Sequence, residues 1–181
     1  IFFIFFLGIL SDIRKLNSPK LRFFFQAIIV LIFLLHSGDI IQGAKVPFID
    51  YLLRFKFFGI ALTLFCILIV INGSNFIDGL NTLCSGYYLS IAIILLFFHV
   101  NELYQFNNIH LFVSILLLIC FFNFFGKSFL GDSGTYSLSF LIGIICINFV
   151  YENHFIVSPY FIACLLWYPA IENLFSILRR L

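Results

Sequence analysis

The chain has 181 residues, of which 63% are hydrophobic and 10% charged, and its mean hydropathy is +1.16. A soluble domain carries about 25% charged residues, so most of this chain must face lipid or other apolar helices. The formal net charge of +2 is small and the basic residues are dispersed, which excludes a nucleic-acid-binding footprint.

Seven apolar segments are expected to be membrane-crossing helices. In chain order they cover residues 1–10, 21–35, 57–72, 85–100, 110–125, 136–150 and 158–178. Helices are favoured over a barrel because these runs are continuously apolar and do not alternate with polar residues. Several runs are shorter than the ~20 residues that a crossing requires, and their aromatic flanks supply the rest. We therefore predict an all-α membrane protein, a bundle of about seven helices forming one domain over residues 1–181.

The first apolar segment begins at Ile1, and the chain contains no Met. We therefore expect the first helix to be incomplete and the chain to be a fragment truncated at both ends. The loop from His36 to Lys56 is expected to form either a hairpin or a short interfacial segment. The five cysteines stand singly, with no C-x-x-C pair, which favours a role as small apolar residues of buried helices.

Three carboxylates stand at the ends of apolar runs, at Asp12, Asp78 and Asp132. An even number of runs separates each from the next, so all three arrive on the same membrane face if each run crosses once. That face also receives seven basic residues, namely Arg14, Lys15, Lys20, Arg22, Lys127, Arg179 and Arg180. The opposite face receives three, namely Lys45, Arg54 and Lys56. The excess of basic residues predicts that the aspartate face is cytoplasmic.

The segment 71–83, INGSNFIDGLNTL, places Asn72, Asn75, Asp78 and Asn81 at three-residue steps. On a helix this spacing would align the four side chains along a drifting stripe of one face. A carboxylate flanked by amides suits a sugar, a uracil ring or a hydrated metal. The alternative is a polar cap and turn that ends one span and starts the next.

The segment 123–136, NFFGKSFLGDSGTY, combines glycines with Lys127 and Asp132. Glycines allow close backbone approach, a lysine can bind phosphate oxygens, and an aspartate can bind a divalent cation. Here too a structural alternative exists, with Lys127 as a membrane-face anchor and the glycines as turn residues.

The segment 8–26, GILSDIRKLNSPKLRFFFQ, places Asp12 at the end of one span and Arg22 and Gln26 at the start of the next. Singly, Asp12 and Arg22 could be ordinary solvated loop charges. Three acids at one membrane face instead favour a shared site, because hard cations take oxygen ligands and a diphosphate needs its charge neutralised.

These three segments, in this order and with spans between them, resemble the polyprenyl-phosphate N-acetylhexosamine-1-phosphate transferases, the MraY/WecA group of glycosyltransferase family 4. The stretch SPYFIACLLWYPAIENLFSILRR is similar to the penultimate region of that family. The resemblance covers essentially the whole chain. It implies a bacterial inner-membrane enzyme that transfers a sugar-1-phosphate from a UDP-N-acetylhexosamine to polyprenyl (undecaprenyl) phosphate, with Mg²⁺ and release of UMP. Such transfer initiates cell-envelope polysaccharide or peptidoglycan synthesis.

By motif position, the resemblance assigns catalytic roles to Asp12, Asp78 and Asp132, with Asp132 the principal metal ligand and Asp12 associated with the lipid phosphate. The implied substrate-binding residues are Asn75 and Asn81 for the nucleotide sugar, Asn123 in the same pocket, and Lys127 and Arg22 for phosphates. The implied partners are the UDP-sugar, the polyprenyl phosphate and membrane lipid, with no nucleic acid. A homodimer is left open.

The sequence departs from the family pattern at Ser11, where an acid usually precedes Asp12, and at Asn81, where an acid is common. We expect Asp12 alone to supply the charge at that corner, and an inactive relative is the alternative. A polytopic transporter is a second alternative, although its acids should lie near the middle of the membrane. A third is an intramembrane serine protease using Ser133 and His154, but the predicted topology separates these two residues across the bilayer.

Overall fold

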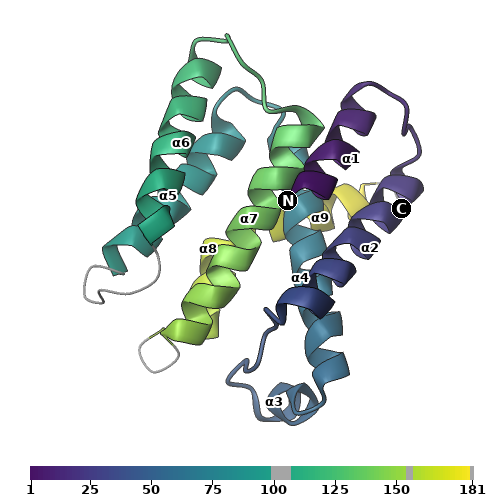
Figure 1. Ribbon diagram of the computed structural model, residues 1–181, viewed down its shortest axis with the longest axis vertical. Coiled ribbons are helices and arrows are strands. Elements are labelled where there is room, and N and C mark those ends of the chain that lie inside the picture. Colours follow the sequence, from purple (N-terminus) through teal and green to yellow (C-terminus); the bar gives the residue numbers. More distant parts are fainter. Residues whose placement is uncertain (99–106, 154–156, 180–181) are drawn as a thin grey trace.

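The computed structural model describes residues 1–98, 107–153 and 157–179. Within these ranges the chain is helical and contains no strand, which confirms the all-α prediction. The helices, labelled in Figure 1, are α1 Phe2–Asp12, α2 Pro19–Ser37, α3 Pro47–Leu53, α4 Lys56–Ile77, α5 Leu83–Phe98, α6 Asn107–Phe124, α7 Gly131–Glu152, α8 Pro159–Leu165 and α9 Trp167–Leu178.

Three helices, α2, α4 and α7, are long and apolar enough to cross a membrane. Helices α8 and α9 meet at a bend of 60° and make a fourth span if they are counted together. Helices α1, α5 and α6 are apolar but shorter. The seven predicted spans correspond in order to these helices, so their number is roughly supported; residues 99 and 100 of the fourth lie outside the described ranges. The loop between His36 and Lys56, for which the sequence allowed a hairpin or a short interfacial segment, contains the short helix α3.

Local sequence signals explain where α2 begins and ends. Pro19 occupies its first turn, where the missing N–H of proline costs nothing. Gly38 closes it with a φ of 77° and donates its backbone N–H to the carbonyl of Leu34. A glycine in this left-handed conformation is a common helix terminator, because it carries no Cβ.

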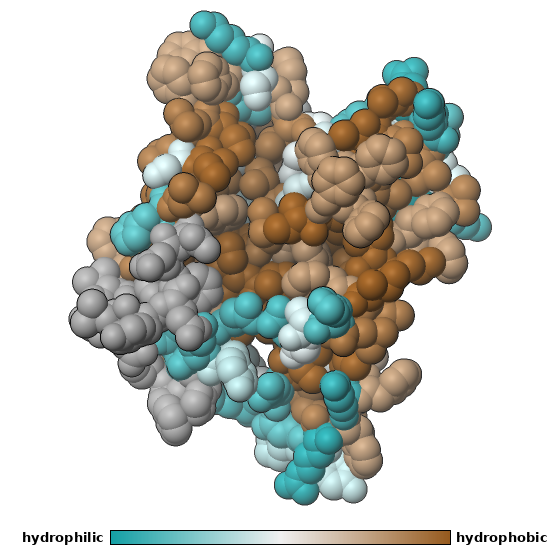
Figure 2. Space-filling view, viewed as in Figure 1, coloured by the Kyte–Doolittle hydropathy of each residue, from teal (hydrophilic) through white to brown (hydrophobic). Residues whose placement is uncertain are grey.

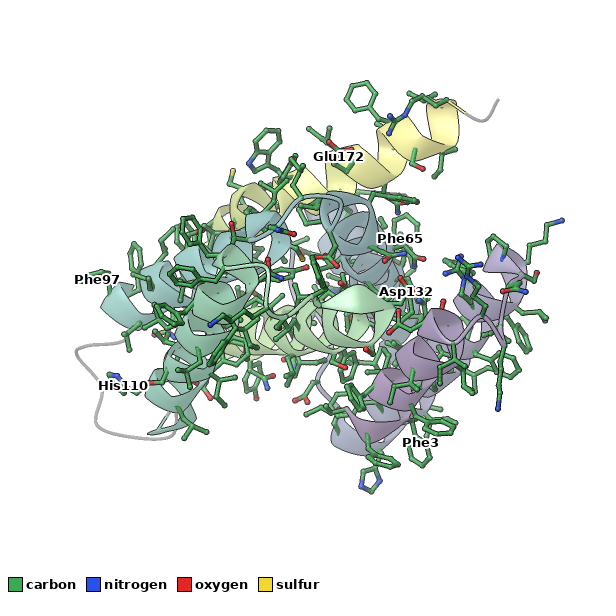
Figure 3. All side chains as sticks on the ribbon, turned by 90° about the horizontal axis from the view of Figure 1, so that it is seen from above. Phe3, Phe65, Phe97, His110, Asp132 and Glu172 are labelled. Atoms are coloured by element: carbon green, nitrogen blue, oxygen red, sulfur yellow. The ribbon has the colours of Figure 1, made fainter. Side chains whose placement is uncertain are left out.

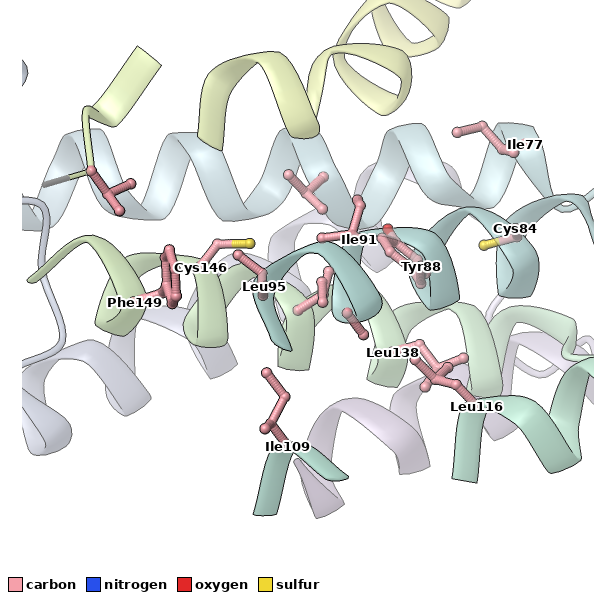
Figure 4. Close-up of a cluster of buried hydrophobic side chains, with 14 residues drawn as sticks. Ile77, Cys84, Tyr88, Ile91, Leu95, Ile109, Leu116, Leu138, Cys146 and Phe149 are labelled. Atoms are coloured by element: carbon pink, nitrogen blue, oxygen red, sulfur yellow. The ribbon is translucent and has the colours of Figure 1, made fainter. Parts of the chain in front are cut away.

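Helix α7 lies in the middle of the bundle and contributes to two buried clusters (Figure 1). The first joins α7 to α4, α5 and α6, and Tyr88, Leu95 and Phe149 are among its buried side chains (Figure 4). The second joins α7 to α1, α2 and α4. Its buried members are Ile4, Val30, Leu34, Ile67, Ile71, Tyr136 and Phe140. Helix α7 is thus held from several sides.

The surface outside these clusters is largely apolar. Figure 2 shows hydrophobic side chains across the middle of the molecule, with hydrophilic ones gathered mostly toward its two ends. Large side chains such as Phe2 and Phe57 are 73% and 83% exposed. Such exposure is unfavourable in water and favourable in lipid, which supports the membrane assignment.

Two glycines permit backbone-to-backbone contact between helices. A Cβ added to Gly8 of α1 would lie 2.2 Å from the Cα of Ser133 in α7. A Cβ added to Gly73 of α4 would lie 1.9 Å from the carbonyl oxygen of Pro169 in α9. Small residues at such crossings are characteristic of membrane helix pairs. These contacts fix how α1 and α9 sit against the central helices.

We expect Gly8→Ala to destabilise the intact protein by about 1 to 3 kcal/mol, because the added methyl group forces α1 away from α7. The matched control is Gly86→Ala in α5, where an added Cβ meets nothing within 4 Å. Thermal unfolding of the detergent-solubilised protein measures both. An equal response of the two variants would contradict the close approach of α1 and α7.

Candidate active site

The first turn of α7 is capped by a carboxylate from α1. Asp12 accepts the backbone N–H of Asp132 at 2.8 Å through Oδ1 and that of Ser133 at 3.1 Å through Oδ2. Gly131 precedes them with a φ of 61°, and a Cβ there would lie 3.0 Å from Oδ2 of Asp12. Glycine is therefore required for both the conformation and the contact. Negative charge at a helix N-terminus is also favoured by the helix dipole.

Asp132 is held by an arginine and two hydroxyl groups. Arg22 of α2 forms an ion pair with Asp132, with 2.8 Å between Nη1 and Oδ2. The same Nη1 lies 2.8 Å from Oγ of Ser11, whose hydroxyl in turn donates to Oδ2 of Asp132. The Tyr136 hydroxyl donates to that oxygen at 3.4 Å. Figure 3 shows Asp132 at the start of α7, beside α1 and α2.

Asp78 follows the last residue of α4 and reaches the same region. The hydroxyl of Thr135 donates to Oδ2 of Asp78 at 3.1 Å and lies 2.7 Å from the carbonyl oxygen of Gly131. The pKa of Asp78 is raised from 3.8 to about 6, mainly by burial; the Thr135 hydrogen bond lowers it, and the charges of Asp132 and Asp12 raise it. The three aspartates are therefore close enough to repel one another.

The donor set fits a divalent cation only in part. Among the described residues, no three His, Cys, Asp or Glu side chains lie close enough together to hold a metal ion. Both carboxylate oxygens of Asp12 are used by the α7 backbone. In the described part of the chain, Asp132 and Asp78 each keep one oxygen, Oδ1, without a hydrogen bond. Because Mg²⁺ is commonly held by one or two carboxylates together with substrate phosphates, these two residues suit it.

A cavity of about 760 Å³ opens beside Arg22, between α2, α4, α7 and α9. Its polar lining includes Arg22, Asn75 and Asn173, and its apolar lining includes Phe65 and Ile177. The cavity is thus lined by a cation, amides and apolar side chains. Of the predicted substrate-binding residues, Asn75 and Arg22 lie here.

Three other predicted residues lie elsewhere. Asn123 is buried, and its Oδ1 accepts the backbone N–H of Thr82 at 2.5 Å, which secures the turn after Asp78. Asn81 does not continue the stripe of Asn72 and Asn75, because α4 ends at Ile77 and Asn81 lies exposed in the following turn. Lys127 is exposed. The structure gives neither Asn81 nor Lys127 a side-chain hydrogen bond to the aspartates within the described ranges.

The sequence analysis did not assign several residues that the structure brings to this region. Ser11 links Arg22 to Asp132, whereas the sequence analysis noted position 11 only as the place where the family usually has an acid. Thr135 and Tyr136 bind Asp78 and Asp132, and their spacing of three and four residues from Asp132 on one helix is a signal that could have found them. Asn173 has no local signal, because its position depends on how α9 packs.

The structure argues against the transporter alternative and does not test the protease alternative. The aspartates lie at helix ends, as an enzyme at the membrane face requires, while a transporter would place them near mid-membrane. The protease alternative rests on His154, which lies outside the described residues.

We expect Asp12→Ala to loosen the start of α7, because two backbone N–H groups lose their acceptors. Hydrogen–deuterium exchange of residues 131–135 should accelerate at least tenfold in the intact protein, while the far end of α7 stays protected. The control is Asp50→Ala at the other end of the bundle, which accepts the Ala44 N–H and should leave α7 unchanged. Unaltered exchange at residues 131–135 would show that Asp12 does not hold this turn.

A second prediction concerns pH. Because the pKa of Asp78 is raised in the folded state, the folded protein binds its proton more tightly than the unfolded chain does. Asp78 should therefore lower stability progressively as the pH rises from about 4 to above 6. In metal-free buffer, Asp78→Asn should melt at a higher temperature than wild type at pH 7.5 and lose that advantage near pH 3.5. An advantage that did not vary with pH would contradict the raised pKa.

Two comparisons with known proteins found matches to this chain. The model of glycosyl transferase family 4 matches residues 1–150. A probable undecaprenyl-phosphate N-acetylglucosaminyl 1-phosphate transferase of Bacillus subtilis (strain 168) is 30% identical over 185 aligned positions, which cover 99% of this chain and 51% of that relative. The chain thus spans about half the length of the relative, and no solved structure matches it. On the family match, the chain belongs to glycosyl transferase family 4.

Proposed function

We propose that the intact protein transfers an N-acetylhexosamine 1-phosphate from a UDP-sugar to a polyprenyl phosphate such as undecaprenyl phosphate, and releases UMP. The observation that carries this proposal is the cluster of Asp12, Asp78, Asp132 and Arg22 at one end of an apolar bundle. The Bacillus subtilis relative has undecaprenyl phosphate and N-acetylglucosamine in its name. For this chain both substrates are part of the proposal.

The position of the cluster suits a reaction between a water-soluble donor and a lipid acceptor. The cavity beside Arg22 joins a polar wall to apolar side chains such as Phe65, Leu68 and Ile177. A prenyl chain can lie along the apolar wall while its phosphate stays near the guanidinium group. The nucleotide sugar then approaches from the aqueous side, which in this proposal is the cytoplasmic face of a bacterial inner membrane; the excess of basic residues on that face supports this orientation.

In this reaction an oxygen of the lipid phosphate attacks the β-phosphorus of the UDP-sugar. A new phosphorus–oxygen bond forms there, and the bond from that phosphorus to the oxygen of UMP breaks. The attacking phosphate is already largely ionised near neutral pH, so it needs no strong base. The main contributions of the protein are alignment and charge neutralisation.

Each residue of the cluster has a role that follows from its contacts. Arg22 binds phosphate oxygens while it remains paired with Asp132. Asp12 holds the α7 turn that carries Asp132, and Thr135 orients Asp78. Mg²⁺, when bound by Asp132 and Asp78, would neutralise the diphosphate charge.

The proposal is tested by incubating the intact protein in lipid vesicles with UDP-N-acetylglucosamine, undecaprenyl phosphate and Mg²⁺. We expect stoichiometric UMP and a lipid-linked sugar diphosphate, and loss of both with EDTA. Transport of the UDP-sugar into the vesicles without UMP release would instead support the transporter alternative. The same absence of UMP without transport would support an inactive relative.

Within this assay, Asp132→Asn should lower the turnover number at least a hundredfold, because an amide keeps the shape of the carboxylate but loses its charge. Asp39→Asn, at the opposite end of the bundle, is the matched control and should retain wild-type turnover. The decisive measurement is the turnover number of each variant as a function of Mg²⁺ concentration. An unchanged Mg²⁺ dependence in Asp132→Asn would remove Asp132 from the metal site.

A further inference from the structure

An amide pair lies one helical turn beyond Arg22, with Gln26 buried and Asn72 partly exposed, and the reaction proposed above uses neither member. Gln26 of α2 is 0% exposed, and its Oε1 accepts a hydrogen bond of 3.0 Å from Nδ2 of Asn72 in α4. The same Nδ2 donates to the backbone carbonyl of Leu68 at 2.8 Å. Asn72 also lines the cavity that Arg22 and Asn75 line.

These contacts fix which way both amides point. The bond to the Leu68 carbonyl requires a donor, so the nitrogen of Asn72 must lie on that side. The bond to Gln26 then uses its second hydrogen, and Gln26 must present its oxygen. The only atom of the Asn72 amide left to bind a ligand is therefore its carbonyl oxygen.

The other end of Gln26 shows what this arrangement costs. Its Nε2 is buried without a hydrogen-bond partner, the only such side-chain nitrogen or oxygen in the described part of the chain. A buried donor without a partner is unfavourable, and an apolar residue of similar size would avoid the penalty. Only the oxygen of Gln26 makes a hydrogen bond. That bond fixes the orientation of the Asn72 amide, and this explains why a glutamine stands here.

We propose that Gln26 is a positioning residue that locks Asn72, and that the Asn72 carbonyl oxygen accepts a hydrogen bond from the nucleotide sugar. This inference rests on the proposed function. A prenyl chain carries no hydrogen-bond donor and a phosphate dianion carries none, whereas a sugar nucleotide carries hydroxyl and amide N–H groups. By this chemistry the pair serves the donor substrate and not the lipid acceptor.

The test uses Gln26→Leu in the intact protein, with initial rates measured at varied concentrations of each substrate. We expect the KM for the UDP-sugar to rise about tenfold, because Asn72 is no longer held, while the KM for polyprenyl phosphate stays within twofold. Thermal unfolding should be unchanged or shifted upward, because the unpartnered donor has been removed. A pair that only holds α2 against α4 would instead give a lower melting temperature and no selective change in KM.

Four further variants make the test specific. Gln26→Glu keeps an oxygen that accepts from Asn72 in either protonation state, and should restore the KM for the UDP-sugar to within about threefold of wild type. Asn72→Leu should raise that KM as Gln26→Leu does, and the double variant should be no worse than Asn72→Leu alone. Gln42→Leu, near the opposite end of the bundle, is the control for the substitution itself and should change neither KM.

The outcomes separate this inference from the proposed function. If wild type transfers sugar phosphate and Gln26→Leu leaves the KM for the UDP-sugar unchanged, or raises the KM for the lipid instead, the inference is wrong and the function stands. If wild type transfers nothing, the proposed function is wrong, and equilibrium binding of UDP-N-acetylglucosamine tests the pair directly. Binding weakened about tenfold in Gln26→Leu supports the inference, and equal binding overturns it.

Discussion

The carboxylate of Asp12 on the first turn of α7 is the interaction on which the rest of the site depends. Two backbone N–H groups at a helix start need acceptors, because the first turn of a helix has no carbonyl of its own to pair with them. Because α1 supplies both, the position of Asp132 becomes tied to the packing of α1. That packing in turn requires Gly8, where the backbones of α1 and α7 touch. The cap by Asp12, the backbone contact at Gly8 and the candidate metal ligand Asp132 thus form one structural unit, in which each position depends on the others.

Charge balance explains why Arg22 and Ser11 belong to this unit. Three carboxylates lie close together, and the pKa of Asp78 is raised by its own burial and, to a smaller extent, by the charges of the other two. Arg22 offsets one of these charges through its ion pair with Asp132. An acid at position 11 would add a fourth negative charge, whereas the Ser11 hydroxyl bridges Arg22 and Asp132 without adding one. The departure from the family pattern is therefore accommodated by a contact that keeps Asp132 and Arg22 in place.

The convergence of Asp12, Asp78 and Asp132 could be predicted because it follows from counting apolar runs, a property of the whole chain. The stripe of amides was predicted for too many residues, since the three-residue spacing persists to Asn81 whereas α4 ends at Ile77. Competition between helix and turn at an Asp-Gly pair cannot be decided from spacing alone. The cavity wall from α9 was not predictable either. It depends on the contact of Gly73 with Pro169, which brings together residues far apart in sequence and leaves no periodic signal.

An arginine at position 22 suits both the ion pair with Asp132 and the phosphate binding that we propose for it. In the structure only Nη1 is bonded to Asp132 and Ser11, so Nη2 and Nε keep donors that those contacts do not use. A lysine could also make more than one bond, but its donors radiate from one nitrogen and lack the planar fork that matches phosphate oxygens. Arg22 also lines the cavity next to Asn75. It can therefore keep Asp132 oriented and bind a phosphate at the same time, so that arrival of the anionic substrate does not require the loss of the ion pair that holds the carboxylate.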